Sequence, residues 1–200
     1  MGRSRFRVRY LDYRATHDVD AWWIETVTEQ DKNLIAQTLE KSLISFGKVK
    51  IRKWGEVVSV ELMQENKTVF SFQIASRSVQ IEKSVSANWI NVPLDSFADL
   101  VASKMIALVE RGSPRDFLDI FSICQAELVT VHECWSLWHK RQMLANSDVN
   151  MGRARLAIET HLARIATHRP LNKIANAPER EQAEKLRTWF LKNFLEVTND

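Results

Sequence analysis

The spacing of hydrophobic residues changes near residue 93 of the chain. Before that point, apolar residues recur every three to four positions over residues 29–46, which predicts a helix that ends at Gly47. Three later segments alternate apolar and polar residues with the two-residue period of a β-strand. They cover residues 49–54, 57–63 and 69–75. The first half of the chain is therefore expected to combine a helix with a small sheet.

The last two of these strands flank a polar turn and predict a hairpin. In the expected register Val58 lies opposite Phe72, and Glu61 lies opposite Val69, so that one face of the hairpin is apolar and the other is polar. At the usual rise of a strand, this register separates Glu61 from Gln73 by roughly 13 Å.

From Pro93 onward the hydrophobic period is helical. Asp95 is expected to be the N-cap of a first helix, which Gly112-Ser113-Pro114 ends, and Pro114 is expected to open a second helix. Further helices are predicted over residues 130–143, 150–166 and 178–195. The sequence therefore predicts an α+β fold, with a small mixed-sheet domain over residues 1–92 and a helical bundle over residues 93–200.

Composition and charge narrow the class of protein. With 200 residues, 45% of them hydrophobic and 26% charged, the chain has enough apolar surface for a globular core. The longest apolar run, near residues 105–109, is far shorter than a membrane span, so no membrane association is expected. Two cysteines are too few for a disulfide framework, and the basic start has no apolar stretch behind it, which favours a cytoplasmic protein.

The net charge of +3 is too small for a general nucleic-acid binder. Residues 140–200 hold 11 Lys and Arg against 7 Asp and Glu, an excess that suits RNA or phosphate but equally suits solvated helix faces. The five glycines are too scattered for a dinucleotide-binding or Walker loop. His132, Cys134 and His139 resemble zinc ligands, but they fall in a Trp-rich helical segment, and we expect them to serve core packing instead.

Asp18 and Asp20 form the first candidate site. On an extended strand these two carboxylates project from one face while Val19 projects from the other, so that both can hold one divalent metal ion. The apolar residues that follow indicate a buried strand, and carboxylates at its start are costly unless something pairs with them.

The second candidate site lies around the predicted helix break at Gly112. Lys104, Arg111 and Arg115 are spaced by seven and four residues and can converge as a basic cluster for phosphates, with Asp116 and Asp119 one helical turn apart. A network of ion pairs within the bundle, with Arg115 bound to Asp119, explains the same spacing.

Together, the two segments resemble the AbiEii toxin family of nucleotidyltransferases, which have a DNA polymerase β-like core. The shared patterns are R-x-T-x-D-x-D at residues 14–20 and K-x-x-A-x-x-x-R-x-x-x-R-D-x-x-D at residues 104–119, and the resemblance covers about residues 3–125. It implies a small mixed-sheet nucleotidyltransferase core followed by a C-terminal helical bundle. It also implies magnesium-dependent transfer of a nucleotidyl group from a nucleoside triphosphate to a nucleic acid such as tRNA, in a toxin–antitoxin system with an antitoxin partner.

The resemblance assigns a role to each matched residue. Asp18 and Asp20 would hold Mg²⁺, and Asp116 would complete the catalytic site. The residues implied in nucleotide binding are Ser4, Lys104, Arg111 and Arg115. The chain departs from the family at Arg3-Ser4, where a pair of glycines or Gly-Ser is usual, and at Gln73, where an aspartate is expected.

Two other interpretations stay open at this point. One is a catalytically degenerate relative that keeps the fold as a binding or regulatory protein, which Gln73 and the missing glycine favour. The other is a helical interaction protein in which both motifs are ion-pair networks. The sequence leaves open the nucleotide base, the acceptor, the oligomeric state and the role of residues 126–200.

Overall fold

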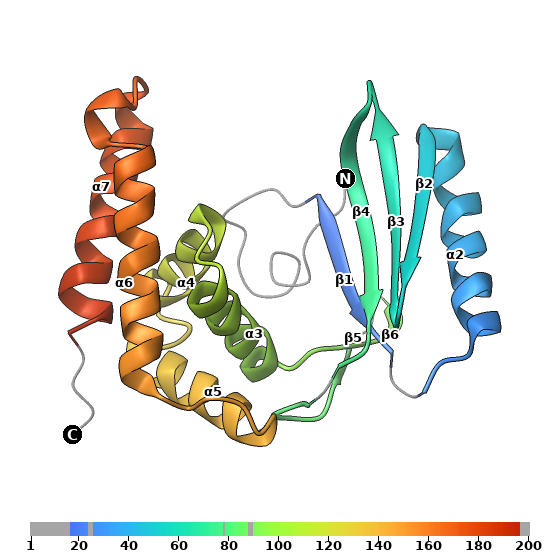
Figure 1. The fold of residues 1–200 in the computed structure, drawn as a ribbon, viewed down its shortest axis with the longest axis horizontal. Helices are drawn as coiled ribbons and strands as arrows, with labels where there is room; N and C mark the ends of the chain where they lie inside the picture. The colour runs from blue at the N-terminus through green and yellow to red at the C-terminus, as the bar shows by residue number, and fades with distance from the viewer. Residues whose placement is uncertain (1–16, 24–25, 78, 88–89, 197–200) are drawn as a thin grey trace. The chain divides into compact units, whose positions relative to one another are not determined.

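The computed structural model describes residues 17–23, 26–77, 79–87 and 90–196. It divides into two compact units, Met1–Ser78 and Val79–Asp200, and this division falls before the change of hydrophobic period near residue 93. The described residues form a mixed fold of six α-helices, a four-stranded mixed sheet and a separate two-stranded hairpin (Figure 1). The prediction that helices and a mixed sheet occur together is confirmed.

The first unit is a four-stranded sheet in the order β1-β4-β3-β2, with one long helix. β1 runs parallel to β4, and the other neighbours are antiparallel. Helix α2, Glu29–Leu43, follows β1 and is extended by a short 3₁₀ turn, Ile44–Phe46. The strands are β1 (Asp18–Trp22), β2 (Lys48–Trp54), β3 (Val57–Gln64) and β4 (Lys67–Ala75).

Helix α2 covers one face of this sheet. Ala36 of α2 and Val58 and Val60 of β3 are fully buried together, and Leu39 and Ile51 pack against them. The helix begins at a capping box between Thr28 and Asp31, which satisfies backbone N–H groups of its first turn. Because side chains alternate along a strand, the residues between the buried valines belong to the opposite face of the sheet.

The register of the β3–β4 hairpin differs from the sequence prediction by two residues. Val58 pairs with Ile74 and Glu61 pairs with Ser71, so the expected partners Phe72 and Val69 were wrong. A two-residue shift keeps every side chain on its predicted face, because the period of a strand is two. The hydrophobic pattern therefore did not distinguish the two registers.

This correction shortens one distance that bears on the site. Glu61 lies opposite Ser71, which is two residues from Gln73 along β4, or about 7 Å instead of 13 Å. A bulge between Leu62 and Met63 and the two-residue turn at Glu65 and Asn66 set the observed register.

The second unit opens with the hairpin β5–β6 and continues as five helices. Pro93 and Leu94 belong to β6, so the helical half starts slightly later than the pattern predicted. The N-cap of the first helix is Ser96 and not Asp95, since the Ser96 hydroxyl accepts the backbone N–H of Asp99 at 3.0 Å. The elements are β5 (Val85–Ala87), β6 (Ile90–Leu94), α3 (Phe97–Glu110), α4 (Pro114–Gln125), α5 (Val131–Leu144), α6 (Met151–His168) and α7 (Ala177–Trp189).

An aromatic cluster forms much of the core of the second unit. Phe117 of α4 packs edge-on against Phe190 with ring centroids 4.8 Å apart, and Trp135 of α5 packs against Phe194 at 5.3 Å and against Trp138 at 5.8 Å. Phe190 and Phe194 belong to a π-helical turn, Phe190–Phe194, that continues α7. The C-terminal helices therefore share one core with α4.

The buried carboxylate of Asp99 connects several segments at the start of the second unit. Asp99 accepts hydrogen bonds from the backbone N–H groups of Ile81 and Glu82, at 3.0 and 3.1 Å, and from the Ser96 hydroxyl at 2.9 Å. Arg141 of α5 donates to the same carboxylate at 3.0 Å. A buried charge of this kind requires such partners, so Asp99 ties α3, α5 and the segment before β5 together.

Within the described ranges, none of the helices combines the length and the apolar character that crossing a lipid bilayer requires.

Candidate functional site

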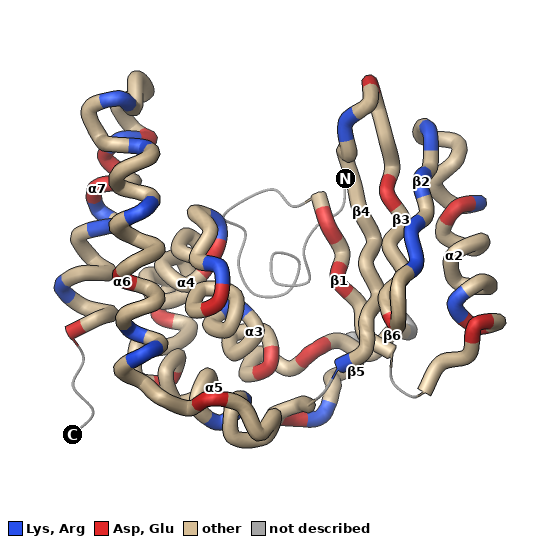
Figure 2. The backbone as a smooth tube through the Cα atoms, in the orientation of Figure 1, with Lys and Arg blue, Asp and Glu red and all other residues tan. Residues whose placement is uncertain are grey.

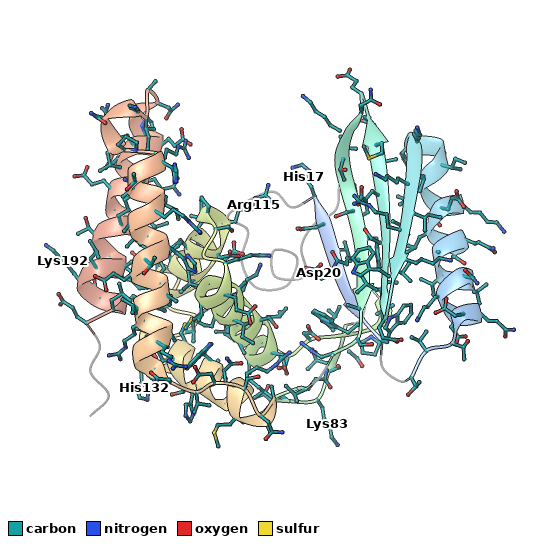
Figure 3. The ribbon with its side chains drawn as sticks, in the orientation of Figure 1. His17, Asp20, Lys83, Arg115, His132 and Lys192 are labelled. Atoms are coloured by element: carbon teal, nitrogen blue, oxygen red, sulfur yellow. The ribbon has the colours of Figure 1, made fainter. Side chains whose placement is uncertain are left out.

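β1 places two carboxylates on one face of the sheet. Asp18 and Asp20 are both exposed, and Val19 between them is half-buried on the other face, as the strand spacing predicts. Asp20 is labelled on β1 in Figure 3. The α-carbons of two residues at positions i and i+2 of a strand lie about 7 Å apart. At this spacing the two carboxylate side chains can converge on one cation.

The neighbouring strand β4 brings a polar residue beside each carboxylate. Asp18 pairs with Ser71 and Asp20 pairs with Gln73 in the parallel register. Paired residues on adjacent strands point to the same face, so Gln73 and Asp20 are neighbours about 5 Å apart. The position at which the family resemblance expects an aspartate is therefore next to the carboxylate pair.

The same face of the sheet continues across β3 to β2, where the charge of its side chains changes from negative to positive. Ser59 and Glu61 of β3 pair with Gln73 and Ser71, and both are buried. On β2, Arg52 forms an ion pair with Glu61. Every second residue of this edge strand lies on the polar face. These residues are three cations and an exposed tryptophan, namely Lys48, Lys50, Arg52 and Trp54. The polar face thus carries acidic residues on β1 and basic residues on β2 (Figure 2).

In the second candidate segment, Lys104 of α3 binds Asp119 of α4. Lys104 Nζ lies 2.6 Å from Asp119 Oδ2, and the Asp119 side chain is 2% exposed against 27% for Lys104. The sequence spacing suggested Arg115 as the ion-pair partner of Asp119. In the structure, Lys104 of the neighbouring helix forms this ion pair. The pair therefore joins α3 to α4.

Asp116, the third carboxylate assigned to catalysis, holds the first turn of α4. Its oxygens accept both Nε and Nη2 of Arg111, at 2.9 and 2.8 Å, and both the backbone N–H and the hydroxyl of Ser113, at 2.9 and 2.7 Å. Burial raises the pKa of the Asp116 carboxyl, but the hydrogen bonds from Arg111 and Ser113 outweigh it, so that pKa lies below its usual value.

Three of these hydrogen bonds end on Oδ2 and one on Oδ1, so most of the accepting capacity of this carboxylate is used. The geometry gives Asp116 a structural role as an N-terminal cap, and a role in catalysis stays a prediction. Arg115, in contrast, is exposed in the first turn of α4 (Figure 3).

The structure groups the predicted residues by unit. Asp18, Asp20 and the unexpected Gln73 come together on the sheet of the first unit. In the second unit, Arg111 meets Asp116 at the α3–α4 turn, and Lys104 meets Asp119 between the two helices. Ser4 and the neighbouring Arg3 lie outside the described residues.

Sequence reasoning missed the part that α6 plays at this turn. The Nε2 N–H of His161 donates to the Val109 carbonyl at 3.1 Å, and Arg164 donates to the Arg111 carbonyl at 2.9 Å. Both carbonyls belong to the C-terminal end of α3, where cationic and N–H donors are favourable. A Cβ at Gly112 would overlap the His161 ring, so this glycine allows the close approach of α6. The sequence showed Gly112 only as a helix break.

The group considered for zinc is dispersed. Cys134 is buried in the core of the second unit, as expected for a packing residue, whereas His132 and His139 are exposed on α5. In the part of the chain that the structure describes, no three His, Cys, Asp or Glu side chains form a metal-binding group.

No family model, no curated protein and no solved structure matches this chain.

Proposed function

We propose that this protein is a metal-dependent nucleotidyltransferase of the AbiEii toxin type, in which the four-stranded sheet with α2 is the nucleotidyltransferase core and the helices that follow form a C-terminal bundle. The observation that carries the proposal is the placement of Asp18 and Asp20 on one exposed face of β1, in register with Gln73 of β4. Two carboxylates on the same face of one strand, beside a polar residue of the next strand, can share one divalent cation.

The residues present suit Mg²⁺. Asp18 and Asp20 offer carboxylate oxygens, which are the ligands this cation prefers, and both side chains are exposed. Gln73 adds an amide oxygen, which is a neutral ligand. When bound, the metal would supply charge neutralisation on the triphosphate and would lower the pKa of the acceptor hydroxyl.

Gln73 limits what this chain does to the acceptor hydroxyl. A carboxamide does not take up a proton near neutral pH, so the proton of the attacking hydroxyl has to pass to Asp20 or to solvent. We therefore propose a slow enzyme. The same residue is the specific observation that favours the second candidate, a degenerate nucleotidyltransferase that binds nucleotide without transferring it.

Cations for the phosphates are present on α3 and α4. Arg115 is exposed, and the Arg111 side chain stays 67% exposed while it binds Asp116. Arginine fits phosphate oxygens with two parallel N–H groups. Lys104 is held by Asp119, so within the second unit Arg115 is the better candidate for binding a phosphate and Lys104 the weaker one.

A nucleic-acid acceptor fits the basic strand β2. Lys48, Lys50 and Arg52 share the polar face with the carboxylates of β1, and Trp54 at the end of the strand is 52% exposed. Regularly spaced cations suit a phosphate backbone, and an exposed aromatic ring suits an unpaired base. A tRNA end is an acceptor of this kind, and an antitoxin partner belongs to the same proposal.

The test is transfer of a labelled nucleotide. The full-length protein is incubated with bulk tRNA, Mg²⁺ and each of the four α-labelled nucleoside triphosphates, and label in the RNA is measured. We expect slow incorporation from at least one triphosphate, loss of it in Asp20→Asn, and no change in the control Asp148→Asn, an exposed aspartate before α6. Equal incorporation by Asp20→Asn would refute the proposal, and nucleotide binding without any incorporation would support the degenerate relative.

A further inference from the structure

Two cysteine thiols meet where α4 ends and α5 begins. Cys124 lies in the last turn of α4 and Cys134 in the first turn of α5, and their sulfur atoms are 3.8 Å apart. A disulfide needs the sulfurs at about 2.05 Å, so they have to approach by a little under 2 Å. Both side chains belong to helix ends in one compact unit, so rotation of the thiols has to supply this movement.

The two thiols differ in access to solvent. Cys134 is fully buried, whereas Cys124 is partly exposed and lines a surface pocket of about 370 Å³ together with Thr130 and Trp189. A small reagent can therefore reach Cys124 first. The hydrogen bond to Cys124 and burial both raise the pKa of the Cys134 thiol, which disfavours its thiolate.

We propose that Cys124 and Cys134 form a thiol–disulfide exchange site that reacts with a low-molecular-weight disulfide. The Cys124 thiolate attacks one sulfur of that disulfide, which forms a mixed disulfide and releases one thiolate. That thiolate takes the proton of Cys134, whose sulfur then attacks Sγ of Cys124 and releases the second thiolate, which takes up from solvent the proton that Cys124 had lost. The protein dithiol is oxidised to a disulfide, and one small disulfide is reduced to two thiols. This site is independent of the proposed nucleotidyl transfer.

The disulfide would link the end of α4 to the start of α5. It closes a short ring that contains the loop with Glu127, a residue with a positive φ of 56°. A crosslink restricts the unfolded chain, so we expect the oxidised protein to melt about 5 °C or more above the reduced protein. α4 also carries Asp116 and Asp119, so the disulfide would attach the helix that holds these two acids of the second sequence motif to α5.

The test uses the full-length, folded protein and oxidised glutathione as the probe. After incubation, free thiols are alkylated and intact mass is measured. Wild type should lose two hydrogens and take up no alkylating agent. Cys134→Ser should stop at one glutathione adduct on Cys124, and Cys124→Ser should stay unmodified because its remaining thiol is buried. Dithiothreitol should restore wild type to the reduced mass and to the lower melting temperature.

Three results would overturn the proposal. Wild type that keeps a glutathione adduct would show that Cys134 does not resolve it, and wild type that does not react would show that Cys124 is not a nucleophile. Modification of Cys124→Ser at the wild-type rate would show that the two thiols are equally accessible. Circular dichroism of each variant establishes that it is folded. If Cys134→Ser does not fold, Cys134→Ala replaces it, since alanine fills the buried position without a polar group.

Discussion

Gln73 is the residue on which the rate of the proposed reaction depends most. It lies beside Asp20 in the observed register and carries an amide where a carboxylate would bind metal more strongly and accept a proton. The two alternatives are a slow enzyme and a binding protein. They differ in whether the remaining carboxylates support nucleotidyl transfer without a carboxylate at position 73.

Gln73→Asp should raise nucleotidyl transfer. A general base or a charged metal ligand contributes roughly 10² to 10⁴ in rate, so an increase in that range is expected under matched Mg²⁺. The control is Gln37→Asp, the same chemical change on the exposed side of α2. A lower rate in Gln73→Asp, with brisk transfer by wild type, would contradict the assignment of Gln73 to the position where the family has its further aspartate.

Lys104 and Asp119 should be energetically coupled. Removing Lys104 leaves a buried carboxylate without this ion-pair partner, so Lys104→Ala should lower the free energy of unfolding by about 2 kcal/mol. In a double-mutant cycle with Asp119→Ala, urea unfolding should give a coupling energy of about 1 to 2 kcal/mol. Additive effects of the two substitutions would show that the pair contributes nothing to stability.

Arg115 should affect ligand and not stability. It is exposed in the first turn of α4, and surface substitutions of this kind usually change stability by no more than about 0.5 kcal/mol. Arg115→Ala should therefore weaken binding of a nucleoside triphosphate more than binding of the matching nucleoside. Arg180→Ala, at an exposed position of α7, is the control. Equal loss for both ligands would place Arg115 outside the phosphate site.

At the level of elements, the turn between α3 and α4 depends on α6. Gly112 has a φ of 50°, and its α-hydrogen side faces the His161 ring, where a methyl group would overlap. The His161 and Arg164 side chains bind carbonyls at the end of α3. The C-terminal helices therefore support the turn that holds the Arg111–Asp116 ion pair.

Gly112→Ala should destabilise the second unit by more than backbone strain alone. Gly55 has nearly the same φ, 52°, with open space around its Cβ position, so Gly55→Ala measures the strain, expected at about 1 to 2 kcal/mol. Gly112→Ala should cost at least about 1 kcal/mol more by chemical denaturation, because the His161 ring has to move. Gly112→Ala/His161→Ala should regain part of the loss, and equal costs at the two glycines would contradict the role of His161.

The sequence predicted elements better than pairings. Helices α3 to α7 follow from hydrophobic period and caps, because those signals are local. The β3–β4 register did not follow, since a two-residue slip leaves the same side chains on the same face. The short hairpin β5–β6 has too few residues to show a period.

The site residues follow the same division. Asp18 and Asp20 lie on one strand, and their common face could be predicted from spacing alone. The partners of Asp116 and Asp119 could not be predicted from spacing. For Asp116, a carboxylate three residues after Ser113 fits a helix cap and a catalytic acid equally well. The position of His161 depends on contacts between segments far apart in the sequence.

At the level of the whole molecule, the two motifs behave differently. The first unit carries Asp18 and Asp20 on the polar side of β1, and the second unit holds its motif acids Asp116 and Asp119 in ion pairs with Arg111 and Lys104. Metal binding, the central claim, therefore rests on the first unit alone. Substitution of Lys104, Asp116 or Asp119 is expected to act mainly through stability, whereas substitution of Arg115 is expected to act on ligand binding.

Calorimetric titration of the full-length protein with each nucleoside triphosphate, with and without Mg²⁺, tests that claim most directly. Wild type and the control Asp148→Asn should bind at least one triphosphate only when Mg²⁺ is present. Asp18→Asn and Asp20→Asn should lose this binding while remaining folded. Binding of equal strength in all four proteins, or binding that does not depend on Mg²⁺, would contradict a metal site at Asp18 and Asp20.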